Sequence, residues 1–495
     1  MSNIDKFYTP VVVIGGGPAG LTAAYELQKC SDNHKPIVIE AGDKVGGISR
    51  TESHNGYRFD IGGHRFFTKV PEVNAMWQEV LEDDFITVPR LSRIFYRGKF
   101  FEYPLKPSNA LKNIGFYESI RIILSYFKWQ LRPYKDEQSF EEWVINRFGG
   151  RLYMHFFRSY TEKVWGIDPK EIRADWAAQR IKNLSLFKAV WNALTGSNDT
   201  ASLIEEFQYP RLGPGMMWEK CAEKVMHKGG EVRMQSEVVR VNREGNRVTS
   251  VDVRRWDKET GPAPVTERIE GEHFVNTMAL RDLIERMDPP PPQHIIDAAN
   301  RLKYRDFLIV TLVLDQKDPF PDNWVYVHTP KIKCGRIQNF RAWSPEMLPD
   351  PTTASIGMEY FCQKGDGLWN MADSDLKELA ASELEELGLG KAADVVDFAI
   401  IRQPKAYPVY DGEYKEALDT LQKWILSLEN FQTVGRNGLH RYNNQDHSML
   451  SAMLAARNIL GSKHDVWGVN VERSYHEEFT VDKKSDNTKA MVSAV

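Results

Sequence analysis

The sequence predicts an α/β protein: a Rossmann-like dinucleotide-binding domain with an inserted helical domain, and a second substrate domain built on an antiparallel or mixed sheet. Three observations carry this prediction. A glycine-rich segment follows an apolar run near the N-terminus, a helix-periodic segment comes next, and several short strand-like apolar runs follow further on. The expected domains are residues 1–70, 208–300 and 430–475 for dinucleotide binding, 71–207 for the helical insertion, 301–429 for the substrate domain, and 476–495 for a tail.

The segment VVVIGGGPAG at residues 11–20 predicts a dinucleotide-binding βαβ unit. An apolar strand precedes the glycines, a helix-prone run follows them, and a second short strand ends at Glu40. In the G-x-G-x-x-G pattern Gly15 makes the tight turn, Gly17 lets backbone approach a pyrophosphate, and Gly20 packs helix on strand. The helix N-terminus favours phosphate, and Glu40 is placed to hold a ribose hydroxyl.

Two further glycine pairs follow this unit, Gly46-Gly47 and Gly62-Gly63. Between them, residues 57–61 alternate apolar and polar, as a half-buried strand does. Glycine pairs next to strands favour backbone pressed against a flat ligand. Two ordinary tight turns remain the alternative.

From residue 70 to about residue 198 the pattern is mostly helical, with apolar residues at helical spacing in 117–131 and 140–157. The segment 115–131 is amphipathic enough to lie on a membrane or a partner subunit, but a core helix is favoured. A homo-oligomer formed through the helical domain is also compatible with this pattern. Further on, the sequence predicts strands within 231–253, 263–273, 306–315, 324–328, 336–342 and 355–361, an exposed helix at 375–387 and a helix at 445–460.

Composition narrows the class of protein. The chain has 495 residues, 42% hydrophobic and 27% charged, with a net charge of −4, so bulk charge gives no case for a nucleic-acid partner. The four cysteines and twelve histidines show no disulfide or metal-ligand spacing, which predicts reduced thiols, no metal and a cytoplasmic location. No apolar run has membrane-spanning length and no secretory signal is apparent.

Several motifs, in order along the chain, resemble one flavoprotein family. The N-terminal unit with GGISRT and DIGGH is similar to the flavin-binding half of the amine oxidase and protoporphyrinogen oxidase superfamily. More specific segments resemble the UDP-galactopyranose mutases: KVWG at 163–166, FQYPRLG at 207–213, YP at 407–408 and VGRNGLHRYNNQDHS at 434–448. The resemblance runs from about residue 10 to residue 475.

The resemblance implies FAD as cofactor, reduced for activity, with NADPH or NADH as external reductant. It implies an isomerase in which reduced flavin N5 attacks the anomeric carbon of a nucleotide-diphosphate sugar and the ring recloses in the other size. This would serve polysaccharide biosynthesis. The alternatives are an FAD-dependent oxidoreductase of the amine oxidase, protoporphyrinogen oxidase or desaturase type, and a flavin-binding scaffold without turnover.

The same resemblance assigns site residues. It implies that Arg341 and Arg436 bind the diphosphate, as bidentate, permanently charged donors would, and that His64 lies beside the reactive edge of the flavin. Implied substrate-binding residues are Tyr103, Lys106, Trp165, Arg180, Trp324, Tyr326, Tyr407 and Tyr442. Implied cofactor-binding residues are Gly15, Gly17, Gly20, Glu40, Gly46, Gly47, Arg50, Gly62, Gly63, Val238, Gly435, Asn444, Gln445 and Ser448.

The chain departs from the family pattern where the base would be read. Leu105 stands where the family has an aromatic residue, and Lys106 stands where it has an amide. Glu205 and Glu206 are acidic where the family has a neutral asparagine. These changes predict weaker recognition of uracil and leave the base and the sugar open.

Overall fold

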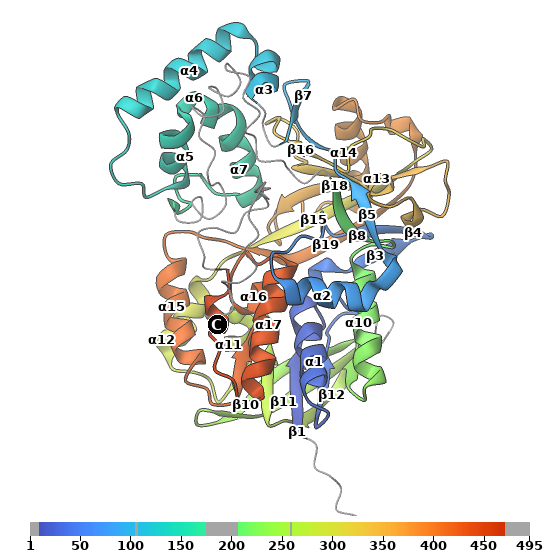
Figure 1. The fold of residues 1–495 in the computed structure, drawn as a ribbon, viewed down its shortest axis with the longest axis vertical. Coiled ribbons are helices and arrows are strands. Elements are labelled where there is room, and N and C mark those ends of the chain that lie inside the picture. The colour runs from blue at the N-terminus through green and yellow to red at the C-terminus, as the bar shows by residue number, and fades with distance from the viewer. Residues whose placement is uncertain (1–8, 104–106, 175–205, 258–259, 471–495) are drawn as a thin grey trace, which may run out of the picture.

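The computed structural model describes residues 9–103, 107–174, 206–257 and 260–470 (Figure 1). Strand β1 and helices α1, α10 and α17 lie at one end of the molecule, and helices α3 to α7 lie at the other. A mixed sheet lies between these regions. The predicted α/β fold class is confirmed.

The dinucleotide-binding end is a five-stranded parallel sheet in the order β20-β13-β1-β2-β9. Its strands are β1 (Thr9–Ile14), β2 (His34–Ile39), β9 (Glu231–Arg233), β13 (His273–Asn276) and β20 (Phe431–Thr433). Helices α1 (Pro18–Cys30), α10 (Gly215–His227) and α17 (Gln445–Ile459) pack beside it. The central strand β1 is completely buried over residues 11–13 and needs cover on both faces, as the inner strands of a parallel sheet do.

A four-stranded sheet flanks this unit in the order β12-β11-β10-β14. Its strands are β10 (Ser236–Glu244), β11 (Arg247–Asp257), β12 (Gly261–Glu270) and β14 (Met287–Asp288), with α11 (Leu280–Arg286) and α12 (Gln293–Arg301) following. The β10–β11 turn falls at residues 245–246, within the predicted turn.

A second sheet, mixed as the predicted fold class allows, has seven strands in the order β19-β15-β18-β17-β16-β6-β7. Its strands are β6 (Ser92–Tyr96), β7 (Lys99–Glu102), β15 (Tyr304–Leu314), β16 (Trp324–Val327), β17 (Arg336–Asn339), β18 (Ala354–Cys362) and β19 (Val395–Pro408). Two differences from the prediction matter for the site. Strand β17 ends at Asn339 and residues 340–343 form helix α13 (Phe340–Trp343), and β19 had not been predicted as a strand.

The predicted helical insertion at 71–207 is not one structural unit. Helix α2 (Pro71–Leu81) packs into the dinucleotide-binding core through Val73, Trp77 and Val80. Strands β6 and β7 extend the second sheet, while β5 (Phe85–Pro89) pairs with β8 (Glu206–Pro210). The helical region proper comprises α3 (Pro107–Ile114), α4 (Phe116–Leu131), α5 (Phe140–Phe148), α6 (Gly150–Leu152), a π-helical turn at Tyr153–Phe157 and α7 (Arg158–Trp165).

Helix α4 differs from its prediction as a core helix. Only Ser119 and Ile122 on it are buried, and large apolar side chains lie exposed along its outer face.

Remaining elements are the β3 (Thr51–His54) and β4 (Tyr57–Asp60) hairpin, α14 (Asp373–Glu386), α15 (Tyr414–Ile425), α16 (Gly435–Gly438) and 3₁₀ turns at Gly47–Ser49, Glu82–Asp84, Pro345–Met347, Ala392–Asp394 and Val466–Gly468. Helix α14 covers the second sheet with Leu376, Ala380 and Leu384.

Candidate active site

A cavity of about 490 Å³ lies where the dinucleotide-binding end meets the second sheet. Its walls come from the glycine loop before α1, from residues 47–50 and 61–67, from β16 and β17, from residues 403–407, and from residues 435–448. Most of the predicted site residues therefore meet in one place although they are spread over more than 400 positions of sequence.

The glycine loop shows why the predicted glycines are needed. Gly15 has φ +104°, and a Cβ there would lie 2.0 Å from Thr277 Oγ1. A Cβ on Gly20 would lie 1.9 Å from the Gly15 carbonyl oxygen, so this glycine serves helix packing rather than the cavity wall. Gly17 is different because a Cβ there would meet nothing nearer than 3.7 Å, and Gly17 lines the cavity as the N-cap of α1.

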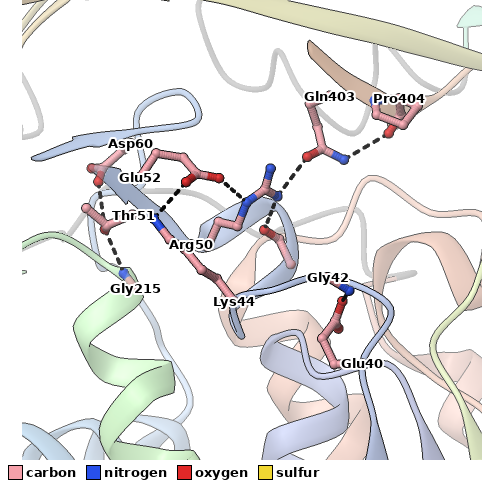
Figure 2. Close-up of polar contacts among 11 residues, drawn as sticks. Glu40, Gly42, Lys44, Arg50, Thr51, Glu52, Asp60, Gly215, Gln403 and Pro404 are labelled. Atoms are coloured by element: carbon pink, nitrogen blue, oxygen red, sulfur yellow. Dashed lines mark hydrogen bonds and ion pairs between the residues drawn. The ribbon is translucent and has the colours of Figure 1, made fainter. Parts of the chain in front are cut away.

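The N-terminus of α1 is suited to bind an anion. No side chain caps this helix, and its first turn has no acidic residue. Backbone N–H groups at a helix N-terminus attract phosphate through hydrogen bonding and the helix dipole. After the end of β2, Glu40 lines the cavity and accepts a hydrogen bond from the Gly16 N–H at 2.6 Å. It accepts another from the Gly42 N–H, also at 2.6 Å (Figure 2). This is where a dinucleotide ribose is bound in Rossmann folds.

Arg50 ties the glycine-rich wall to the second sheet. Its Nη1 donates to the Gly47 carbonyl and to Gln403 Oε1 of β19, each at 2.8 Å, and its Nε donates to Glu52 at 2.6 Å (Figure 2). Gly47 and Gly62 have φ +55° and +91°, and both line the cavity with Gly63. Gly46 has φ +102° but lies outside the lining.

His64 lies in the cavity wall directly after the second glycine pair. Its Nε2 is 2.9 Å from the Ile61 carbonyl oxygen, which accepts a hydrogen bond when Nε2 carries the proton. Burial, with Arg436 nearby, lowers the pKa of His64 to about 4. The imidazole is therefore neutral at physiological pH and has a fixed orientation.

Arg436, at the start of α16, is a cation without a carboxylate partner among the described residues. Its Nε donates to the Asn443 carbonyl at 2.9 Å and its Nη1 to the Ala406 carbonyl at 3.1 Å. The guanidinium lies 5.4 Å from the Tyr407 ring centroid and 5.1 Å from that of Tyr442. These neutral contacts hold the group in place and leave its charge for an anion in the cavity.

Tyr407 and Tyr442 form one face of the cavity. Their rings stack with centroids 5.5 Å apart and planes 15° apart. Burial, together with Tyr442, raises the pKa of Tyr407, so its hydroxyl remains protonated. Trp165 contacts both rings from outside the lining, at 6.3 and 6.2 Å, and so supports the stack.

The structure does not bring Arg341 to the cavity. Because the chain turns into α13 after Asn339, the Arg341 side chain points away from the lining and its Nε lies 3.3 Å from Asp318. Arg336, five residues earlier on β17, lines the cavity instead, together with Gln338. The period-2 pattern of β17 places residues 336 and 338 on one face, which is the signal that the sequence interpretation missed.

Arg336 is paired inside the sheet. Its Nε donates to Glu359 Oε2 at 2.6 Å, and Gln338 Nε2 donates to Glu359 Oε1 at 2.7 Å. Burial lowers the pKa of Arg336, but the attraction of Glu359 outweighs burial and raises it well above its ordinary value. Arg336 therefore stays charged beside the cavity.

The other predicted residues divide into those that line the cavity and those that do not. Tyr103, Trp324, Tyr326, Gly435, Asn444, Gln445 and Ser448 line it. Val238 is buried on β10 outside the lining, and Lys106 and Arg180 fall outside the described residues. Arg65, Arg90 and Lys405 also line the cavity and were missed, because a single cation outside a recognisable motif gives no sequence signal.

Residues 18–464 match the family model described as "Flavin containing amine oxidoreductase". This chain belongs to that family. Protoporphyrinogen oxidase 2 of Arabidopsis thaliana is 22% identical over 87% of this chain and 90% of its own length. dTDP-fucopyranose mutase of Escherichia coli is 27% identical, over 33% of this chain and 44% of that protein.

Two other curated relatives are matched only over short parts of their length. Protoporphyrinogen oxidase 1 of A. thaliana is matched over 32% of its length, and coproporphyrinogen III oxidase of Mycobacterium leprae over 15%. Among solved structures, reduced UDP-galactopyranose mutase superposes with a TM-score of 0.80 at 20% identity, over 94% of this chain and 98% of that one. This likeness establishes a shared fold.

The family is flavin-containing, which supports FAD as the cofactor, and the residues present fit it. Gly15, Gly17 and Gly47 leave the backbone bare along the cavity, the α1 N-terminus suits a pyrophosphate, and Glu40 suits a ribose. Gly435 has φ +85° and lies against Ala19, which brings the start of α16 next to the start of α1.

Proposed function

We propose that this protein is an FAD-dependent mutase that interconverts the pyranose and furanose forms of a nucleotide-diphosphate sugar. The observation that carries the proposal is Arg436, a cation held by carbonyls and tyrosine rings in the cavity wall without a carboxylate partner among the described residues. Such a group suits an anion that enters and leaves. The shared fold with UDP-galactopyranose mutase and the partial match to dTDP-fucopyranose mutase support the same class of substrate.

In this proposal, Arg436 and Arg336 hold the diphosphate and stabilise the charge that develops on it as it leaves the sugar. The Tyr407 and Tyr442 hydroxyls would donate to phosphate oxygens. Trp324, Tyr326 and Tyr103 line the cavity and would contact the sugar. Reduced FAD, when bound, would supply the nucleophile for the anomeric carbon, and NADPH or NADH would reduce it.

Neutral His64 contributes orientation rather than charge. Its Nε2–H is committed to the Ile61 carbonyl, so it is not a proton donor from that atom. With a pKa of about 4, it adds no positive charge that would compete with Arg436 for the diphosphate. We place it beside the cofactor as a fixed, neutral wall.

A binding titration tests the ligand class. Reduced protein is titrated with UDP, dTDP and GDP while its tryptophan fluorescence is followed, because Trp324 lines the cavity. Saturable binding of at least one nucleoside diphosphate, well above that of the matching nucleoside, is expected. Equal and weak responses to nucleosides and nucleoside diphosphates would contradict the proposal.

The second candidate is an FAD-dependent oxidoreductase. The full-length match to protoporphyrinogen oxidase 2 and the family itself favour it. The cations of the cavity would then bind a carboxylated substrate. This candidate predicts net consumption of an electron acceptor or release of peroxide, which the mutase does not.

A further inference from the structure

Helix α4 carries an exposed apolar stripe along its whole length. Its members are Phe116, Tyr117, Ile120, Leu124, Phe127 and Leu131, all of them exposed. At about 100° per residue, these six side chains fall within an arc about 100° wide. A helix of a globular protein usually turns such an arc toward the core, and here it faces outward.

The inner face of α4 fixes this orientation. Ile122 is buried in the core of the helical region, and a Cβ on Gly149 would lie 2.8 Å from Tyr126 Cα, so the α5–α6 junction packs directly against the helix. Trp129 stacks on Tyr134 at 4.9 Å and anchors the C-terminal end. The stripe therefore cannot rotate inward without breaking these contacts. Figure 1 shows α4 at the outer edge of the helical region, at the end of the molecule opposite β1.

Positive charges flank the stripe. Arg121 and Lys128 lie on one edge of it, and Arg132 and Lys135 follow the end of the helix, all four exposed. Lys128, Arg132 and Lys135 have no carboxylate partner among the described residues. The one acid of the helix, Glu118, is already bound by Arg151 Nε at 2.6 Å and His155 Nε2 at 3.0 Å, and Arg121 Nη1 lies 3.4 Å from its Oε2, so of the four cations only Arg121 has a carboxylate nearby in the part of the chain that the structure describes.

We propose that α4 docks this protein on an anionic lipid surface, with the stripe in the boundary between headgroups and acyl chains and the cations on the headgroups. An interfacial helix combines one apolar face with flanking Lys and Arg in this way. With 16 residues, α4 is about 24 Å long, and within the described part of the chain no helix is both long and apolar enough to cross a bilayer.

The charges favour a lipid surface over a second copy of the chain. In a two-fold interface with parallel helices, the cations of one copy meet those of the other. Like charges at that distance oppose association. With antiparallel helices, the cations meet the N-terminal end of the partner helix, whose one acid, Glu118, is already paired within its own chain. A lipid surface covers the apolar stripe at the boundary with its acyl chains, and its anionic headgroups attract the flanking cations.

The test uses the full chain and vesicles of phosphatidylcholine alone or mixed equally with phosphatidylglycerol. Wild type should sediment with the mixed vesicles, at least about tenfold more tightly than with phosphatidylcholine, and release at high salt. Leu124→Glu should reduce binding about tenfold or more. Leu426→Glu is the matched control, because Leu426 is 64% exposed and Leu124 is 63% exposed, and it should bind as wild type does.

A charge variant separates the contribution of the cations from that of the apolar stripe. Lys128→Gln with Arg132→Gln should weaken binding to mixed vesicles more than about fivefold, while Lys423→Gln on α15 should not. Unchanged flavin content would show that each variant is folded. The proposal is overturned if wild type ignores mixed vesicles, if it binds both vesicle types equally, or if Leu124→Glu binds as wild type does. It is also overturned if sedimentation velocity shows a dimer that Leu124→Glu splits while neither protein binds vesicles.

Discussion

Arg436 lies over the ring of Tyr442, with its guanidinium carbon 5.1 Å from the ring centroid, and no carboxylate among the described residues neutralises it. Arg341, which the family resemblance had paired with it, lies outside the cavity beside Asp318. These two arginines therefore form a natural test pair. Arg436 should bind the ligand, whereas Arg341 should make no contact with it.

The first prediction concerns nucleotide binding. Arg436→Ala should weaken binding of the preferred nucleoside diphosphate by about 3 kcal/mol, roughly 100-fold, because a buried phosphate loses its charged partner. Arg341→Ala should leave the affinity within about twofold of wild type. Fluorescence titration measures both. Equal losses in the two variants would remove Arg436 from its assigned role.

The second prediction separates two glycines of the same loop. Gly17→Ala should fold with nearly wild-type stability, since its Cβ would meet nothing nearer than 3.7 Å in the protein, but should lose flavin because the methyl group occupies the pyrophosphate path. Gly20→Ala should instead destabilise the fold, because its Cβ would clash with the Gly15 carbonyl at 1.9 Å. Thermal unfolding and the flavin-to-protein absorbance ratio report the two effects. Full flavin occupancy in Gly17→Ala contradicts the assignment.

The third prediction concerns the ion pair beneath the cavity. The Glu359 side chain is completely buried and holds both Arg336 and Gln338. Glu359→Gln leaves the Arg336 charge without its partner and should lower the free energy of unfolding by about 3 kcal/mol in urea. Glu346→Gln, at an exposed pair with Arg211, should change it by less than about 0.5 kcal/mol. A loss at Glu359 no greater than at Glu346 would mean that the pair contributes nothing.

The fourth prediction is a pH dependence of stability. Burial lowers the pKa of His440 to about 4, and His440 is completely buried. In the unfolded chain this imidazole takes up a proton below about pH 6.5, whereas in the folded chain it stays neutral until about pH 4, so stability falls as pH falls through this window. His440 should account for about 2 kcal/mol of the loss between about pH 7 and about pH 5.

Two variants test whether His440 causes this loss of stability. His440→Gln should lack that part of the loss, and His227→Gln, at an exposed histidine, should keep it. Urea unfolding at both pH values gives the comparison. A wild-type pH dependence in His440→Gln would show that the loss comes from other groups.

The glycine-rich wall of the cavity was predictable because local sequence dictates it. The strand, the glycine turn and the helix are contiguous in sequence. Glycine is required at position 20 because a Cβ there would clash with the Gly15 carbonyl, and at position 15 because a Cβ would clash with Thr277. The Arg436 and Tyr442 segment was found by resemblance, and the structure brings it to the same cavity.

The wall of the cavity that the second sheet provides was less predictable because it depends on where strands end. The choice of Arg341 over Arg336 turned on whether β17 continued past Asn339, and nothing in residues 336–342 marks that end. Strand β19 escaped prediction because most of its side chains are only half-buried, so it lacks a clear period-2 pattern. In α4, periodicity identified the helix but not the direction of its apolar face, which tertiary packing decides.

The most direct test of the central claim is product analysis under anaerobic conditions. Reduced protein is incubated with UDP- and dTDP-hexopyranoses, and products are separated by chromatography while the electron balance is followed. The account predicts a furanose product formed over many turnovers with no net consumption of reductant or acceptor. Product formed only with stoichiometric acceptor or peroxide, and none from the reduced protein, would contradict it and leave the oxidoreductase in its place.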